Sequence, residues 1–95
     1  MSEVRDGKIT WDKPSEEKFQ KILEQIPDLI RGIAETRVSK KAENIVREEN
    51  RWVITEKDMV TAFFAETPPA FLSAMKKSMQ ELGIDYTKYG CEGNG

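Results

Sequence analysis

Residues 52–63 read WVITEKDMVTAF and contain the transition that decides the fold. The β-branched residues Val53, Ile54 and Thr55 favour an extended backbone, and the apolar residues after them recur at helical spacing. Thr55 is a preferred N-cap residue. Asp58 stands three positions later, where a capping box places an acceptor, although aspartate is shorter than the usual glutamate. We predict an extended segment followed by a capped helix, with no chemistry for Thr55.

Upstream of this stretch, residues 27–50 are predicted to form one long helix. Its apolar residues recur every three or four positions, the spacing of a helix with one buried side. At a rise of about 1.5 Å per residue the helix spans about 35 Å, which makes it the central helix of the domain. Its apolar positions are Ile30, Ile33, Ala34, Val38, Ala42, Ile45 and Val46.

The chain is expected to turn a sharp corner into this helix at Pro27. Proline disfavours helical geometry at the preceding residue, Ile26, and its fixed φ fits the first position of a new helix. A separate helix therefore precedes the corner, and it opens at Pro14. Its apolar side consists of Phe19, Ile22, Leu23 and Ile26.

Arg31 and Gly32 lie one turn beyond the corner. We expect Arg31 to bind a carboxylate of another segment or of a partner through two hydrogen bonds, or else to pair with Glu35 on the surface. A glycine inside a helix costs about 1 kcal/mol relative to alanine. We therefore expect another backbone to approach Gly32 closely, with a neutral exposed glycine as the alternative.

Residues 67–84 predict a further helix. Thr67 is expected to cap it and Pro68 to occupy its first position. Gly83 fits the left-handed position after its last turn, with Ile84 folding back towards the helix. The apolar side of this helix consists of Phe71, Leu72, Met75, Met79 and Leu82.

The predicted fold class is all-α, a small bundle of about four helices with a long central helix. Apolar residues alternate in Lys8–Trp11 and in Arg51–Ile54, so a short two-stranded pairing between them is also expected. The predicted organisation is a flexible segment at 1–10, a helical domain at 11–66, an added helical segment at 67–89 packed on it, and a disordered tail at 90–95.

The composition argues against several kinds of site. The chain has no histidine, and Cys91 is its only cysteine. It therefore has no internal disulfide, no zinc site of the usual composition, and no Ser-His or Cys-His catalysis. No pair of carboxylates has a spacing typical of acid–base catalysis. We assign no catalytic, cofactor-binding or metal-binding residue and expect no cofactor.

Charge and hydropathy limit the kinds of partner that the chain is expected to bind. The net charge is −2, so the whole chain carries no field that attracts nucleic acid. The long helix has a basic stretch, but acidic residues balance it, and we expect a solvated helix rather than a nucleic-acid site. No apolar run approaches the roughly 20 residues that span a bilayer. Residues 1–11 lack the apolar core of a secretory signal, so we expect a cytoplasmic protein without membrane contact.

Trp11 and Trp52 are the two tryptophans of the chain. They are expected to be core residues with an exposed indole edge. The alternative is an aromatic pocket that they line together for a flat ligand.

Trp11, IPDLIRGIA at 26–34, Ala42 and VITEKDMVTA at 53–62 occur in a suggestive order. This pattern resembles the PCP-reductase domain, the small C-terminal domain found in light-independent protochlorophyllide reductase. The resemblance covers roughly residues 11–63, and Asp28 departs from it where the family often has a bulky apolar residue. It implies an accessory domain, because the iron–sulfur cluster and substrate cavity of that enzyme lie elsewhere.

The favoured hypothesis is an accessory protein-interaction domain, with a redox enzyme as one possible partner and no catalytic centre of its own. One alternative is a component of a tetrapyrrole reductase in chlorophyll biosynthesis, with Trp11, Arg31 and Trp52 near the pigment. The other is a nucleic-acid-binding module that uses the basic stretch. The interaction or motif candidates are Trp11, Pro27, Arg31, Gly32, Trp52 and Thr55.

Overall fold

The computed structural model describes residues 9–90. Cys91 and the other residues of the predicted tail after Gly90 lie outside this range, as does Lys8. The elements, in chain order, are β1 (Thr10–Trp11), α1 (Lys13–Glu24), α2 (Asp28–Glu48), β2 (Val53–Ile54), α3 (Glu56–Glu66), the 3₁₀ turn η2 (Pro69–Phe71), α4 (Leu72–Glu81) and the 3₁₀ turn η3 (Tyr86–Tyr89).

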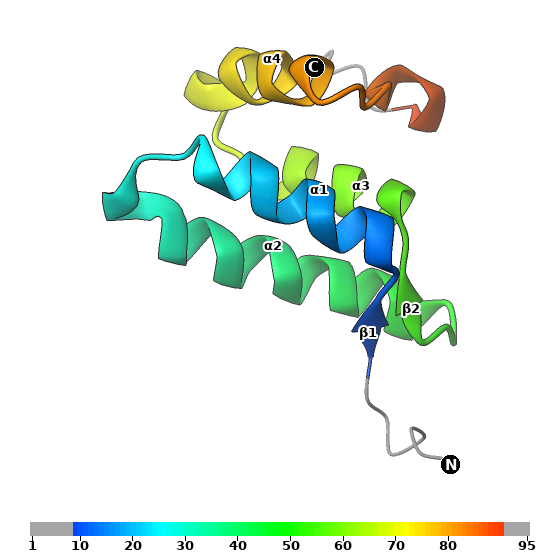
Figure 1. Cartoon of the computed structure of the whole chain (residues 1–95). Coiled ribbons are helices and arrows are strands. Elements are labelled where there is room, and N and C mark those ends of the chain that lie inside the picture. The colour runs from blue at the N-terminus through cyan, green and yellow to red at the C-terminus, as the bar shows by residue number, and fades with distance from the viewer. Residues whose placement is uncertain (1–8, 91–95) are drawn as a thin grey trace.

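The four α-helices of the described chain form a small bundle, as predicted, and α2 is the longest of them (Figure 1). α1 and α3 run in one direction, and α2 and α4 return in the other. α2 packs mainly against α3, while α4 lies on the opposite side of α1 and α3. The two short strands lie at the end where α1 and α3 begin.

The predicted strand pairing is confirmed, and its direction is parallel. Thr10 is paired with Val53, and Trp11 with Ile54. The Thr10 N–H donates to the Trp52 carbonyl at 3.0 Å. Each strand leads directly into the N-cap of a helix, because Asp12 caps α1 and Thr55 caps α3. The parallel pairing therefore brings the N-termini of α1 and α3 to the same end of the bundle.

Both caps follow from local chemistry. The Asp12 carboxylate accepts a hydrogen bond from the Ser15 N–H at 3.0 Å, so α1 starts one residue before Pro14. Asp58 accepts from the Thr55 N–H at 2.9 Å and completes a capping box. The shorter aspartate therefore reaches the N-cap, and the capped helix predicted from residues 52–63 is confirmed.

The ends of α2 and α4 share one geometry. Asn50, with φ 60°, and Gly83, with φ 77°, both adopt the left-handed conformation. In the residue after each, the backbone N–H bonds back to the helix: the Arg51 N–H donates to the Val46 carbonyl and the Ile84 N–H to the Met79 carbonyl, both at 2.9 Å. These are Schellman-type ends. The predicted left-handed conformation of Gly83 is confirmed. The long helix, predicted to reach residue 50, ends at Glu48, because Asn50 adopts the left-handed conformation.

The start of α4 differs from the prediction. Thr67 is the residue that ends α3, and its hydroxyl donates to the Met75 sulfur at 3.1 Å. Pro68 is extended, with ψ 149°, and precedes a 3₁₀ turn instead of occupying the first position of α4. The two consecutive prolines explain the shift, because Pro69 disfavours helical geometry at Pro68. Phe71 belongs to that turn and is exposed.

One apolar core joins all four helices. Its fully buried residues come from α1, from the second half of α2, from β2 and α3, and from α4 and the segment after it. Residues 67–89 therefore contribute buried side chains to the same core. The buried apolar residues are Phe19, Ile22, Leu23, Val38, Ala42, Val46, Ile54, Met59, Val60, Ala62, Phe63, Met75, Met79, Ile84 and Tyr86.

Candidate interaction surface

Three apolar side chains are exposed on the first two turns of α2. Leu29 is 82% exposed and Ile33 is 57% exposed, and Ile30 is also exposed. We call these three residues the α2 apolar surface. α2 has no buried residue before Val38, so this part of the helix lies beyond the packed core.

The predicted burial of Ile30 and Ile33 is therefore wrong. Ala34 and Val38 belong to the side of α2 that faces the bundle, and Ile33 lies about 100° round the helix from Ala34. Ile30 lies nearer the buried side, but it is one turn before Ala34, where the helix leaves the bundle.

Arg31 fixes the corner that carries this surface. Its Nε donates to the Leu23 carbonyl at 2.8 Å and its Nη2 to the Ile26 carbonyl at 2.9 Å. Its Nη1 lies 2.8 Å from the Asp28 carboxylate. Arg31 thus makes several directed contacts, as expected, but its tertiary partners are carbonyls at the end of α1. Among residues 9–90, neither a carboxylate of another segment nor Glu35 pairs with it.

Pro27 and Gly32 differ in their importance for this corner. Pro27 is the N-cap of α2, one position before its predicted place, and its carbonyl accepts from the Ile30 and Arg31 N–H groups at 3.0 Å. Around Gly32, a methyl group would find nothing within 4 Å. The expected close approach of a backbone is wrong, because this turn of α2 lies outside the packed part of the bundle.

The exposed side of α2 becomes basic after the α2 apolar surface. Arg37, Lys40 and Arg47 are exposed and Lys41 is half-buried. Within residues 9–90, Arg37, Lys40 and Lys41 make no ion pair, and Arg47 bonds to the Asn44 side chain at 3.1 Å. The basic stretch noted in the sequence is thus partly free to contact another molecule.

Arg51, the last basic residue of that stretch, binds carboxylates of the chain itself. Its Nη2 and Nη1 donate to the two oxygens of Asp58 at 2.7 and 3.1 Å, and it also pairs with Glu49 at 2.8 Å. Asp58 is only 3% exposed. Burial acts to raise the pKa of the Asp58 carboxyl, but hydrogen bonds from Arg51 and Thr55 outweigh it and hold that pKa below its ordinary value.

A second polar network joins the start of α3 to α1 and to the C-terminal turn. The Glu56 carboxylate accepts from the Lys18 amine at 2.6 Å and from the Tyr89 hydroxyl at 2.9 Å. Burial raises the pKa of Glu56, but the bonds from Lys18 and Tyr89 reverse the shift, so it lies below the ordinary value. Burial and the bond to Glu56 raise the pKa of Tyr89 to about 12.

The sequence analysis missed the Arg51–Asp58 contact and the whole Glu56 network, because the partners lie in different elements. For Asp58, the capping position was the available signal. For Glu56, no pattern in the sequence pointed to Lys18 or Tyr89. In both networks the charged groups bind one another, which is the arrangement of structural rather than catalytic residues.

The two tryptophans differ in their surroundings within residues 9–90. The Trp11 ring stacks on Phe19, with centroids 4.5 Å apart, and packs against the core. Trp52 is 51% exposed and lies beside the exposed Val53, before β2 turns inward at Ile54. In the described chain, the ring contact of Trp11 is with Phe19 and no ring contact joins it to Trp52. Trp11 thus fits the expected core residue with a partly exposed ring, whereas Trp52 does not belong to the core.

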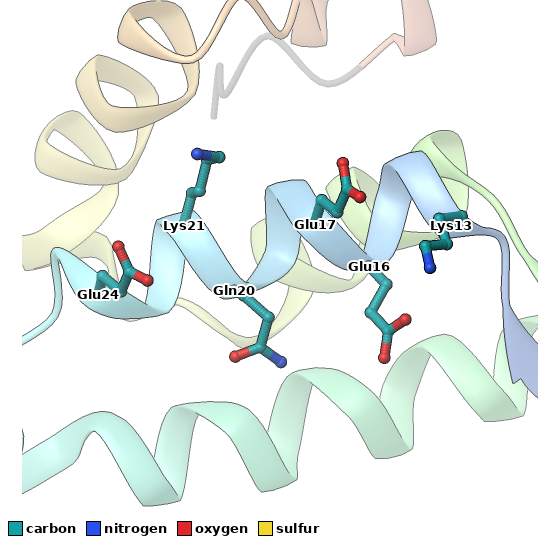
Figure 2. Close-up of a pocket in the computed structure, with 6 residues that line it drawn as sticks. All are labelled: Lys13, Glu16, Glu17, Gln20, Lys21 and Glu24. Atoms are coloured by element: carbon teal, nitrogen blue, oxygen red, sulfur yellow. The ribbon is translucent and has the colours of Figure 1, made fainter.

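The outer side of α1 carries an open hollow of about 440 Å³ (Figure 2). Its lining residues are Lys13, Glu16, Glu17, Gln20, Lys21 and Glu24. All six come from one helix and all are polar or charged, so the hollow is a solvated helix side rather than a ligand pocket. Among residues 9–90, no cluster of acidic or cysteine residues is arranged to bind a metal ion. No described helix has the length and apolar content to cross a membrane.

Comparison with curated proteins and with solved structures finds no match. A family described as "Protein of unknown function (DUF2621)" matches residues 3–91. The resemblance to the PCP-reductase domain is therefore wrong, because nothing links the matching family to that domain. The redox-enzyme partner and the role in tetrapyrrole reduction rested on this resemblance and lose their support.

The structure explains why the short motifs misled. Pro27 and Arg31 build a tight corner between two helices, and Thr55 caps a helix. These are local tasks that unrelated helical domains solve with the same residues. A match over nearly the whole chain carries more weight than such motifs, and the chain belongs to the DUF2621 family, whose description is a protein of unknown function.

Proposed function

We propose that this chain is a protein-interaction module that binds a partner protein through the α2 apolar surface. The observation that carries the proposal is the exposure of Leu29, at 82%, beside Ile33, at 57%, on one side of a helix. Contiguous exposed apolar side chains are typical of interaction sites. Burying apolar area contributes roughly 25 cal/mol per Å², so a partner that covers this surface gains affinity.

The contacts that hold the corner between α1 and α2 support this proposal. Arg31 holds the first turns of α2 against the end of α1 through the Leu23 and Ile26 carbonyls. Leu29 and Ile33 therefore lie on a rigid helix, and little conformational entropy is lost when a partner binds.

The module has no catalytic centre of its own in this proposal. The most buried ionisable side chain of the described residues, Asp58, is held by Arg51 and Thr55. The half-buried Glu56 is held by Lys18 and Tyr89. We further propose that the module acts in the cytoplasm, because a chain with one cysteine cannot form an internal disulfide and suits a reducing compartment.

Site-specific photocrosslinking tests the proposal. A photoreactive amino acid is placed at Leu29 of the full chain and expressed in cells of the source organism. As a matched control, it is placed at Glu17, an exposed helical position on the polar side of α1. We expect a discrete crosslinked partner from position 29 and none from position 17. Equal labelling from both positions, or none from position 29, contradicts the proposal.

A further inference from the structure

The exposed side of α2 changes character along the helix axis. Leu29 and Ile33 are one turn apart, and Arg37 follows Ile33 by the same four-residue step. Lys40 lies seven residues after Ile33. Positions four and seven apart share one side of a helix. A single exposed ridge therefore begins apolar near the Pro27 corner and continues basic.

The second half of this ridge carries an excess of positive charge. Residues 37–47 contain four basic residues and one acidic residue, within a chain of net charge −2. Arg37 and Lys40 are exposed and form no ion pair with any described residue. By contrast, Lys18, Arg31 and Arg51 each pair with a carboxylate inside the chain.

We infer that the partner presents an acidic amphipathic helix to this ridge. Its apolar side chains cover Leu29 and Ile33, and its aspartate or glutamate side chains, one to two turns further on, approach Arg37 and Lys40. The distance along α2 from Leu29 to Lys40 is about 17 Å, or about three helical turns. Opposite charges at the basic end fix the direction in which the partner lies. This inference rests on the proposed function and specifies the chemistry of the partner.

The same ridge fits a membrane surface less well. A helix that lies in a membrane interface has apolar side chains along its whole length. On the exposed side of α2 they stop at Ile33, and basic residues follow.

A second copy of the chain also fits poorly. An antiparallel pairing that buries Leu29 against Ile33 leaves the basic residues of both copies beyond the contact. A parallel pairing places them against like charge.

A display selection tests the inference. A library of helical peptides of about 14 residues, long enough to cover the ridge, is selected for binding to the full chain. Binders of the Leu29→Ser/Ile33→Ser variant are removed at each round. Enriched peptides are synthesised and titrated against three proteins: the natural chain, an Arg37→Glu/Lys40→Glu variant, and a Lys76→Glu/Lys77→Glu variant. The last variant has the same net charge but its changes lie on α4. Circular dichroism confirms that each variant is folded.

We expect the enriched peptides to carry paired apolar residues followed by acidic residues. Their affinity should fall about tenfold for the Arg37→Glu/Lys40→Glu variant, the size expected from reversing two exposed ion pairs. The α4 variant should bind as the natural chain does. Added salt should weaken binding to the natural chain.

Four other outcomes contradict the inference, and they differ in what they imply for the proposed function. Peptides that require Leu29 and Ile33 but show no preference for acidic residues overturn the inference and leave the proposed function standing. A selection that yields no peptide dependent on Leu29 overturns both. Leu29-dependent binding to vesicles containing phosphatidylserine, without peptide binding, assigns the ridge to a membrane. A dimer in sedimentation equilibrium that Leu29→Ser abolishes assigns it to a second copy. Each of these last two results overturns the inference.

Discussion

Arg51 and Asp58 form a two-point contact that joins the residue after the left-handed end of α2 to the first turn of α3. The Nη2–Oδ1 distance is 2.7 Å and the Nη1–Oδ2 distance is 3.1 Å. The same carboxylate accepts from the Thr55 N–H and hydroxyl. One buried side chain therefore both caps α3 and holds the end of α2, so the link between two core helices depends on its charge.

The Asp58→Asn variant should be less stable at neutral pH. Its amide cannot supply four acceptor contacts, and we expect the free energy of unfolding to fall by about 1–3 kcal/mol. The natural pKa of Asp58 is lowered by folding, so its stabilising contribution is present above the ordinary aspartate pKa and is lost as the pH falls through the lowered value. Urea denaturation at neutral and acidic pH should show the two proteins converging in acid. An equal difference at both pH values contradicts this.

Replacing Arg31 by lysine should loosen the corner between α1 and α2. A single ammonium cannot reproduce the planar contacts to the Leu23 and Ile26 carbonyls. Because Arg31 is partly exposed, we expect a loss of about 1 kcal/mol in the free energy of unfolding. Arg37→Lys is the matched control and should change stability by less than about 0.5 kcal/mol. Equal effects of the two substitutions in denaturant titrations would refute the role of Arg31.

Gly32→Ala should stabilise the protein. Gly32 lies within α2, where a methyl group meets nothing within 4 Å, so alanine gains about 0.5–1 kcal/mol. The contrasting substitution is Gly83→Ala. Gly83 has φ 77° at the end of α4, where alanine is disfavoured by about 1–2 kcal/mol. Thermal unfolding should therefore shift in opposite directions for the two variants, and a shift in the same direction argues against the structure at one of the sites.

The Tyr89–Glu56 bond should appear in the ionisation of the phenol. In a Tyr86→Phe background, Tyr89 is the one remaining tyrosine of the chain, and its ultraviolet titration should give a pKa of about 12. Adding Glu56→Gln should lower that pKa, because the neutral amide no longer opposes the tyrosinate charge. The raised pKa also means that the stability contributed by Tyr89 is present below the ordinary tyrosine pKa and is lost as the pH rises through about 12. An unchanged pKa after Glu56→Gln would exclude the bond.

Leu29→Ser should leave the fold intact. Leu29 makes little contact with the core, so we expect a change of less than about 0.5 kcal/mol in the free energy of unfolding. Met79→Ala, which truncates a fully buried side chain of α4, should cost about 2–5 kcal/mol. Denaturant titration distinguishes the two. A large loss of stability for Leu29→Ser shows that the α2 apolar surface belongs to the core and not to an interface.

Features decided by neighbouring residues could be predicted from the sequence. The capping box of Thr55, the corner at Pro27 and the left-handed Gly83 depend on side chains within one turn of each other. Asn50 was missed, although asparagine is the second residue typical of the same left-handed position. Its signal was present in the sequence.

Features decided by distant segments could not be predicted in this way. Periodicity shows that Ile33 lies on an apolar stretch of a helix, but not that the bundle ends before it reaches this turn. The sequence indicated that Arg31 makes directed bonds, but not that its partners are carbonyls, and it gave no sign that Arg51 binds a buried carboxylate. The exposure of Leu29 and Ile33 depends on where the other helices lie, and the pattern of one helix does not contain that information.

The parallel pairing of Thr10 with Val53 has a consequence for the order of folding. The chain between the two strands contains all of α1 and α2, so this contact closes a long loop and repays its entropy only after both helices have formed. During synthesis, β1 emerges first but has no partner until β2 is made. Hydrogen-exchange pulse labelling should therefore find the Thr10 and Asp12 amides protected later than those of the helices. Within residues 9–90, β1 begins the chain of elements and is thus among the last to gain its hydrogen bonds.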